Sequence, residues 1–194
     1  MPPPILRTQI AEIPEVSASL ARAFQQEDLI AWLVPEVQLR ATFLSRLFRL
    51  LVEQHVPDGD VFHDEAHSGA VIARSSTVQL DQRIDDFADL RASLSERSRQ
   101  RLDHVDHLVR LARPHWEHYY FAFCGVLPTA AGTGLGTALI QACLSTEAAQ
   151  RLPGYAEASN MAGVTLMCRN GFTVAESMPI SPTLGLALHP LHRA

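Results

Sequence analysis

The chain has 194 residues, of which 47% are hydrophobic and 19% are charged, and its formal net charge is −5. This composition excludes the disordered, collagen-like and low-complexity classes, and the length predicts a single domain, 1–194, with a full hydrophobic core. The basic residues, all of them arginine, form no run of the kind that follows a phosphate backbone, so we expect no nucleic-acid partner.

Three cysteines, Cys124, Cys143 and Cys168, stand among apolar or small residues. An odd number in such surroundings argues against a disulfide framework and for a reducing compartment, so we expect a cytoplasmic protein. The N-terminal residues lack the basic and apolar segments of a signal peptide, and arginines interrupt the longest apolar helix candidate, at 39–52. We therefore expect neither a signal peptide nor contact with a membrane.

In the first half of the chain, the spacing of apolar residues predicts two amphipathic helices, at 16–24 and 39–51. A hairpin follows, with strands at 60–65 and 69–74. The segment 81–113 predicts a long helical insert, as one broken helix or two. Pro114 ends it, because proline cannot continue a helix interior.

In the second half of the chain, glycine and proline mark the ends of the predicted elements more clearly. Residues 118–127 are dense in aromatic and apolar side chains and predict a buried central strand that ends at Pro128. A glycine-rich segment and a helix follow this strand. The remaining predicted elements are a strand at 155–159, a helix at 161–170, and strands at 172–180 and 183–189.

The most informative local feature is the helix entry Gly132-x-Gly134-x-Gly136. Glycines at this position let backbone N–H groups converge on an anion, and the helix dipole adds to the attraction, so the spacing predicts a phosphorylated ligand. The loop of a nucleoside triphosphatase is excluded, because the chain has no lysine. The dinucleotide loop of a nicotinamide-dependent oxidoreductase is a weaker alternative: Glu157 lies at about the expected distance, but Pro128 separates the glycines from the strand.

Two motifs stand on either side of the strand at 155–159. Val126-Leu127-Pro128 leads into the loop that starts at Ala131, and a second group follows the strand: Asn160, Gly163, Leu166, Met167, Gly171 and Phe172. In these spacings the chain resembles the GNAT superfamily of acyl-CoA-dependent N-acyltransferases. That family has Gln/Arg-x-x-Gly-x-Gly/Ala in the loop and Asn-x-x-Ala-x-x-Leu-Tyr-x-x-x-Gly-Phe as its second motif. The resemblance is detailed over about 114–172, which would form the CoA-binding core.

The resemblance implies a mixed α/β fold: a central, mostly antiparallel sheet of about seven strands that splays at Pro128, with helices on both faces. It also implies acetyl transfer from acetyl-CoA to the amine of a small molecule by direct attack. In similar proteins the final strands often pair across two subunits, so the resemblance also admits a homodimer.

The resemblance further implies which residues hold the cosubstrate. Loop amides would bind the CoA pyrophosphate, and the backbone around Gly125 would pair with the pantetheine arm. The implied set is Gly125, Val126, Ala131, Gly132, Thr133, Gly134, Leu135, Gly136, Thr137, Asn160, Gly163 and Met167.

The chain departs from the family at Met167, where a tyrosine usually serves as general acid and a thioether cannot donate a proton. A non-catalytic protein that binds acyl-CoA is therefore an alternative. The candidates for the general base are His118, Tyr120 and Glu157, on strands that border the expected cleft. Cys124 and Cys168 are candidate acyl carriers, although direct transfer needs no nucleophile.

Histidine clusters offer a competing class of site. The run His63-Asp64-Glu65-x-His67 is superficially similar to a zinc motif, but His-Glu-x-x-His requires a helix beneath both histidines, and here we expect a hairpin. His104 and His107 are expected to lie on a solvated helix face. The sequence therefore predicts no metal site.

Overall fold

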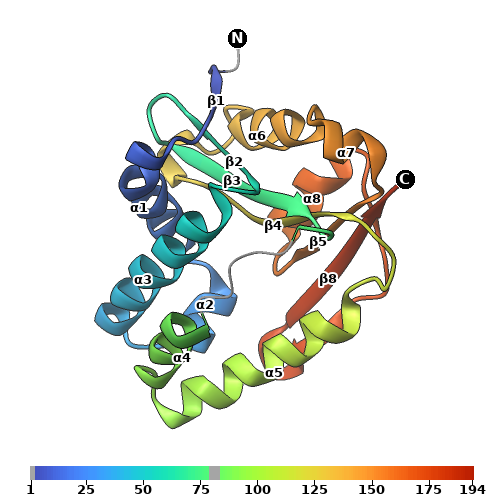
Figure 1. Ribbon diagram of the computed structural model, residues 1–194. Helices are drawn as coiled ribbons and strands as arrows, with labels where there is room; N and C mark the ends of the chain where they lie inside the picture. The colour runs from blue at the N-terminus through green and yellow to red at the C-terminus, as the bar shows by residue number, and fades with distance from the viewer. Residues whose placement is uncertain (1–2, 79–83) are drawn as a thin grey trace.

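The computed structural model describes residues 3–78 and 84–194. Within them, one sheet of eight strands has the order β1-β2-β3-β4-β5-β8-β6, and β7 pairs with β8 off this path (Figure 1). The strands are β1 (Ile5–Arg7), β2 (Asp60–Asp64), β3 (Gly69–Ser75), β4 (Tyr119–Val126), β5 (Gly154–Ala158), β6 (Thr173–Val174), β7 (Met178–Ser181) and β8 (Leu186–Arg193). The helices are α1 (Ile13–Phe24), α2 (Asp28–Leu33), α3 (Val37–His55), α4 (Ile84–Ala92), α5 (Glu96–Ala112), α6 (Leu135–Leu144), α7 (Glu147–Arg151) and α8 (Met161–Arg169). Short 3-10 turns are η1 (Ile10–Glu12), η2 (Pro128–Ala130) and η3 (Pro182–Leu184).

Helices cover both faces of the sheet (Figure 1). Alternate residues of β3 point to opposite faces: Ala70 and Ile72 pack with α1 and α3, whereas Val71 and Ala73 pack with α6 and α8. Every described strand pair is antiparallel except β4–β5. This confirms the predicted mixed α/β fold with a mostly antiparallel sheet.

The sheet splays between β4 and β5. The two strands pair in parallel from Tyr119 opposite Gly154 to Phe121 opposite Ala156, and there the pairing ends. At the same point the register between β3 and β4 shifts, because Ile72 pairs with Phe123 and Ala73 with Phe121. A bulge of this kind bends a strand and increases its twist. The splay therefore begins after Phe121, and the prediction that it begins at Pro128 is wrong.

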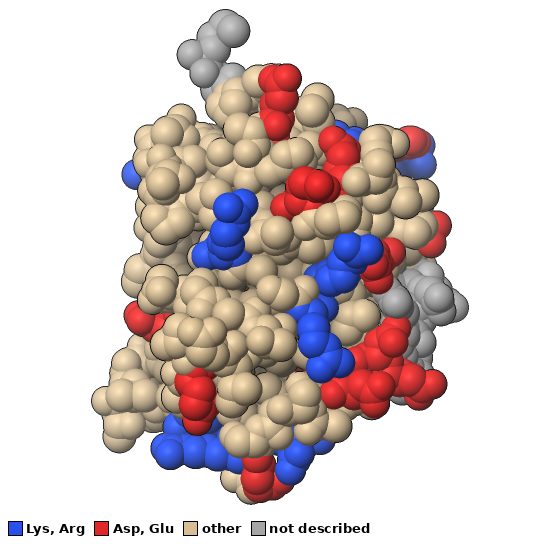
Figure 2. Space-filling model, turned by 90° about the vertical axis from the view of Figure 1, so that its left-hand side faces the viewer, with Lys and Arg blue, Asp and Glu red and all other residues tan. Residues whose placement is uncertain are grey.

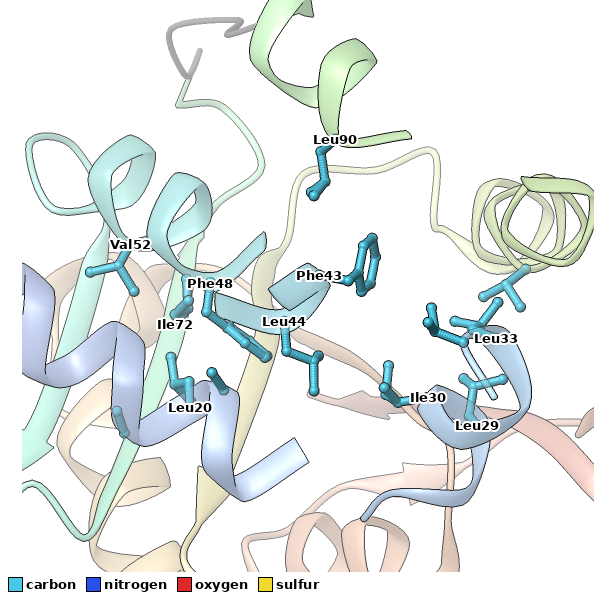
Figure 3. Close-up of a cluster of buried hydrophobic side chains, with 14 of the residues drawn as sticks. Leu20, Leu29, Ile30, Leu33, Phe43, Leu44, Phe48, Val52, Ile72 and Leu90 are labelled. Carbon is cyan, nitrogen blue, oxygen red and sulfur yellow. The ribbon is translucent and has the colours of Figure 1, made fainter. Parts of the chain in front are cut away.

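The larger core lies between the sheet and the first five helices. Figure 3 shows Leu44 and Phe48 of α3 pointing toward Leu20 of α1 and Ile72 of β3, and all four are at most 1% exposed. The apolar residues of α3 recur at helical spacing, which places them on one face and confirms the sequence prediction for this helix. This core fixes the wall of β4 that faces the splay.

The segment 81–113 forms two helices, α4 and α5, which is one of the two predicted alternatives, and residues 81–83 lie outside the described part of the chain. Other predicted elements need correction. The strand predicted at 172–180 is divided into β6 and β7. The final strand, β8, continues past Pro190, whose carbonyl still accepts a hydrogen bond from the Ala175 amide at 2.8 Å. The apolar spacing predicts neither β1 nor α2, because both are too short to show a clear periodicity.

No helix of the described segments has both the length and the apolar character that crossing a membrane requires.

His55, buried near the end of α3, couples folding stability to pH. Its Nδ1 lies 2.7 Å from the carbonyl oxygen of Leu51, and burial lowers the pKa of the ring from 6.5 to about 4. Because the folded-state pKa lies below the unfolded one, the stabilisation is complete above pH 6.5 and is lost as the pH falls through about 4. We expect the free energy of unfolding to fall by about 3 kcal/mol over that interval. Urea unfolding at stepped pH checks this, and a His55→Gln variant with the same pH dependence as the wild type would contradict it.

Candidate functional site

A cavity of about 610 Å³ opens at the splay between β4 and β5. Apolar side chains from α2, α3, α5, β4 and α8 form most of its wall, among them Phe43, Phe123 and Met167. Tyr120 and Glu157, two of the predicted catalytic residues, line it as well. The sheet thus brings these two together in a largely apolar chamber, which is the usual setting for a small-molecule site.

Glu157, on β5, is the carboxylate at the centre of this arrangement. Its Oε1 is buried without a hydrogen-bond partner among the described residues, and so is the hydroxyl oxygen of Tyr155. Burial raises the pKa of Glu157, while the nearby hydroxyls of Tyr120 and Tyr155 and the charge of Arg113 act in the opposite direction. A carboxyl group with a raised pKa and an unsatisfied oxygen is suited to exchange a proton with a ligand.

His118 lies behind this chamber rather than in its wall. The side chain is 3% exposed, and its Nδ1 lies 2.8 Å from the carbonyl oxygen of Trp116. The ring packs edge-on against Tyr155, with the centroids 5.3 Å apart, and burial lowers its pKa. The described cavity lining does not include His118, so the geometry favours Glu157 over His118 as the base.

The glycine loop presents unobstructed backbone. Gly132 and Gly134 have φ angles of 77° and 87°, in the left-handed region that favours glycine, and a Cβ built on either meets nothing within 4 Å. The first backbone hydrogen bond into α6 runs from the Ala138 amide to the Gly134 oxygen, at 3.0 Å. The amides of Leu135, Gly136 and Thr137 therefore have no acceptor within the helix and stay available to an anion.

Other loop positions serve the packing of the loop itself. Leu135 is 2% exposed and belongs to the core beneath α6, and a Cβ on Gly136 would lie 3.3 Å from the side chain of Leu166. Thr133 donates from its hydroxyl to the Ala130 oxygen at 2.8 Å. Ala131 and Thr133 add no charge, so backbone amides and the helix dipole supply the attraction for a phosphate.

The exposed edge of β4 supplies further amide donors. The Leu127 amide donates to Ser68 beside β3, at 2.7 Å. Because amides alternate between the two edges of a strand, those of Cys124 and Val126 point away from β3, into the splay. Gly125 has another role: a Cβ there would lie 2.8 Å from the Phe24 ring, so glycine lets α1 pack closely on β4. Val126 thus fits the predicted pantetheine contact, whereas the Gly125 amide faces β3.

The start of α8 is organised around a carboxylate that the sequence analysis missed. Glu27 accepts hydrogen bonds from the Ile30 amide at 2.9 Å, from Ser159 Oγ at 2.9 Å and from Asn160 Nδ2 at 3.2 Å. Asn160 also accepts from the Gly163 amide at 2.8 Å, as the cap of α8. The predicted cofactor residues Asn160 and Gly163 thus line the cavity, and the hydrogen bond between them caps α8. The only sequence signal for Glu27 is its place as the cap of α2.

The comparisons with solved structures show the fold. The histone acetyltransferase HPA2 and related acetyltransferase from Corynebacterium glutamicum superposes with a TM-score of 0.71 at 20% identity over 100% of this chain and 96% of its own. Arylalkylamine N-acetyltransferase 2 from Aedes aegypti gives 0.67 at 11% identity over 98% of each chain. An agmatine N-acetyltransferase gives 0.64 at 15% identity over 97% of each chain. Protein-family models and curated proteins give no match.

These similarities assign the chain the fold of GNAT-type acetyltransferases, as the sequence resemblance implied. The glycine loop stands at the start of α6, as the sequence predicts. The dinucleotide-binding alternative requires a mostly parallel sheet, whereas among the described strands only β4 and β5 pair in parallel.

Proposed function

We propose that the protein is an acetyl-CoA-dependent N-acetyltransferase that acts on a small-molecule amine. The observation that carries the proposal is the position of Glu157, a carboxylate with a buried, unsatisfied oxygen in the cavity at the β4–β5 splay. Free backbone amides lie at the start of α6, in the glycine loop, and on the edge of β4 that faces the splay. Together they supply a base for one substrate and a backbone cradle for the other.

The cavity supports a compact, partly apolar amine as acceptor. Aromatic and aliphatic side chains dominate its wall, and two carboxylates, Asp106 and Glu157, face it. The one arginine in the described lining, Arg91, is held by the Asp103 carboxylate through Nε–Oδ1 at 3.0 Å. The lining therefore carries more negative than positive charge, which favours an ammonium group as ligand. On the face shown in Figure 2, acidic and basic side chains are interspersed, without a continuous track for a polyanion.

Acetyl-CoA supplies the acetyl group as a thioester, and its binding rests on this chain's backbone. The open space at Gly132 and Gly134 fits a pyrophosphate, and the amides of Cys124 and Val126 fit the pantetheine arm and the thioester carbonyl. Donors aimed at an oxygen that gains negative charge are worth a few kcal/mol of barrier. Glu157 takes the proton of the bound ammonium, and the free amine then attacks the thioester carbon, from which the CoA thiolate leaves.

Cys124 and Met167 bear on two steps of the mechanism: whether an acyl-enzyme forms, and what protonates the leaving thiolate. Cys124 lines the cavity, but burial raises the pKa of its thiol to about 12, so the thiolate needed for an acyl-enzyme is scarce at neutral pH. Direct transfer is therefore favoured. Met167, at the position where the resemblance expects a tyrosine, is 5% exposed and offers no proton to the leaving thiolate. A thiol with an ordinary pKa of about 8.5 leaves without such help.

Release of free CoA from acetyl-CoA tests the proposal. Purified protein is incubated with a panel of primary amines, aromatic, aliphatic and polycationic, and the thiol released is measured. We expect release with the compact apolar amines, at rates well above the amine-free blank. Binding of acetyl-CoA without release on any amine would instead identify a non-catalytic acyl-CoA-binding protein, the role that Met167 favours.

A further inference from the structure

A second cluster of chemical groups lies outside the cavity, where β2 turns into β3. The ligand atoms of Glu12, His63 and His67 all lie within 4.8 Å of one another. His63 Nε2 is 3.4 Å from Glu12 Oε2, and the two imidazole rings stack with centroids 4.6 Å apart. The predicted hairpin under the two histidines is confirmed, and pairing of β1 with β2 brings Glu12 beside them.

No hydrogen bond satisfies the Nε2 atoms of His63 and His67 among the described residues. His63 is 1% exposed, and its Nδ1 lies 2.9 Å from the carbonyl oxygen of Asp64, which can only accept. In the neutral ring the proton therefore sits on Nδ1, and Nε2 presents a lone pair. That lone pair faces the Glu12 carboxylate, another acceptor. His63 Nε2 and His67 Nε2 are both buried without a hydrogen-bond partner among the described residues.

The two facing acceptors, His63 Nε2 and Glu12 Oε2, can be satisfied together by a cation between them. Two imidazoles and a carboxylate are a recurrent ligand set for zinc, with a water in the fourth position. Ligands of a tetrahedral zinc ion about 2.0–2.2 Å from the metal lie about 3.3–3.5 Å apart, and the His63–Glu12 distance of 3.4 Å falls in that range. The backbone carbonyl on His63 Nδ1 is the outer partner that metal-binding histidines usually have.

We propose that Glu12, His63 and His67 bind a divalent transition-metal ion of the zinc class. Imidazole ligands favour zinc, cobalt, nickel or copper over magnesium and calcium. The ion enters from the side of Glu12, whose side chain is 31% exposed. Because the rings are nearly parallel, at 6°, the His67 ring must turn out of the stack to share the ion. His67 sits in the turn itself, where its Nε2 has no hydrogen bond to hold it.

The bound ion would join the segment before α1 to the β2–β3 hairpin. Asp64 already organises the turn by accepting from the amides of Ser68 and Gly69, at 2.7 and 2.8 Å. Glu12 Oε2 accepts from the Gln9 amide at 2.8 Å, which fixes the carboxylate. None of the three proposed ligands is among the described residues that line the cavity, so this site is separate from the proposed transfer site.

Calorimetric titration of EDTA-dialysed protein with ZnCl₂, and with MgCl₂ as the contrast, tests the proposal. We expect one zinc ion per chain, no binding of magnesium, and a melting temperature about 5–10 °C higher at zinc concentrations 100-fold above Kd. Glu12→Gln and His67→Asn should each weaken zinc binding by about 10-fold or more. Asparagine tolerates the positive φ of 50° at His67, so that variant keeps the turn.

The matched control removes two histidines from a solvated helix face. His104 and His107 are exposed on α5, and the double variant His104→Ala/His107→Ala should bind zinc as the wild type does. The proposal is overturned if the wild type shows no saturable zinc binding, which would leave a shared proton as the cation in the cluster. It is equally overturned if the Glu12 and His67 variants bind zinc with wild-type affinity, because the ion would then sit elsewhere.

Discussion

We expect a Glu157→Gln variant to lose acetyl transfer by a factor of about 10²–10⁴ in kcat and to bind acetyl-CoA as the wild type does. The amide has the shape of the carboxylate but cannot take a proton from the bound ammonium. Burial is the largest influence on the pKa of Glu157. The substitution should therefore affect proton transfer and not the binding of acetyl-CoA at the glycine loop. Initial rates of CoA release and a separate acetyl-CoA titration measure the two effects.

The pH profile gives this prediction a second readout. Burial raises the pKa of Glu157 above its ordinary 4.5, and a base works only when deprotonated. The acid limb of kcat/KM should therefore lie above pH 4.5 in the wild type and disappear in the variant. Glu147→Gln is the control, since Glu147 is exposed on α7 and pairs with Arg151. Equal rates for Glu157→Gln and Glu147→Gln would remove Glu157 from the mechanism.

A Phe48→Ala variant is destabilised by about 3–5 kcal/mol, the largest stability change that we expect from a single truncation. Phe48 is 1% exposed and packs against the rings of Phe24 and Phe123, with ring centroids 5.1 and 5.3 Å away. Both neighbours line the cavity, so the truncation leaves a void directly behind its wall. Thermal unfolding should show a melting temperature about 6–20 °C lower.

The matched control lies on the same helix. Leu39 is 56% exposed on α3, and Leu39→Ala should change the free energy of unfolding by less than about 0.5 kcal/mol. If Phe48→Ala unfolds within about 1 kcal/mol of the wild type, then α3 does not pack on β4 as described. If both variants are strongly destabilised, the loss of stability comes from any truncation in α3 and not from its buried face.

The elements that the sequence predicts well are those with a strong local signal. The helix α3 is predicted by its apolar spacing. The loop is predicted by Gly132 and Gly134, because glycine is the residue that most readily adopts the positive φ angles found there. The sheet could not be ordered from the residues alone, because pairing joins segments far apart in the chain. The start of the splay depends on the bulge beside Ile72, which leaves no mark in the sequence.

The candidate site was predicted only in part, for the same reason. Tyr120 and Glu157 reach the cavity because β4 and β5 are neighbours there, whereas His118 precedes the first residue of β4 and is buried behind the chamber. Glu27 and Glu12 gain partners from segments far away in the chain, so the sequence does not show these contacts. The position and the partners of such side chains depend on contacts between distant segments rather than on local propensity.

The central claim is that the glycine loop and the β4 edge hold acetyl-CoA beside Glu157. Thermal unfolding with and without acetyl-CoA, with NADH as the contrast, tests it most directly, alongside a Gly134→Val variant whose side chain enters the open space at φ 87°. We expect acetyl-CoA at 100-fold above Kd to stabilise the wild type by about 2.7 kcal/mol, and NADH to have no effect. The gain should shrink in the variant. No shift with millimolar acetyl-CoA, or an equal shift with NADH, would contradict the account.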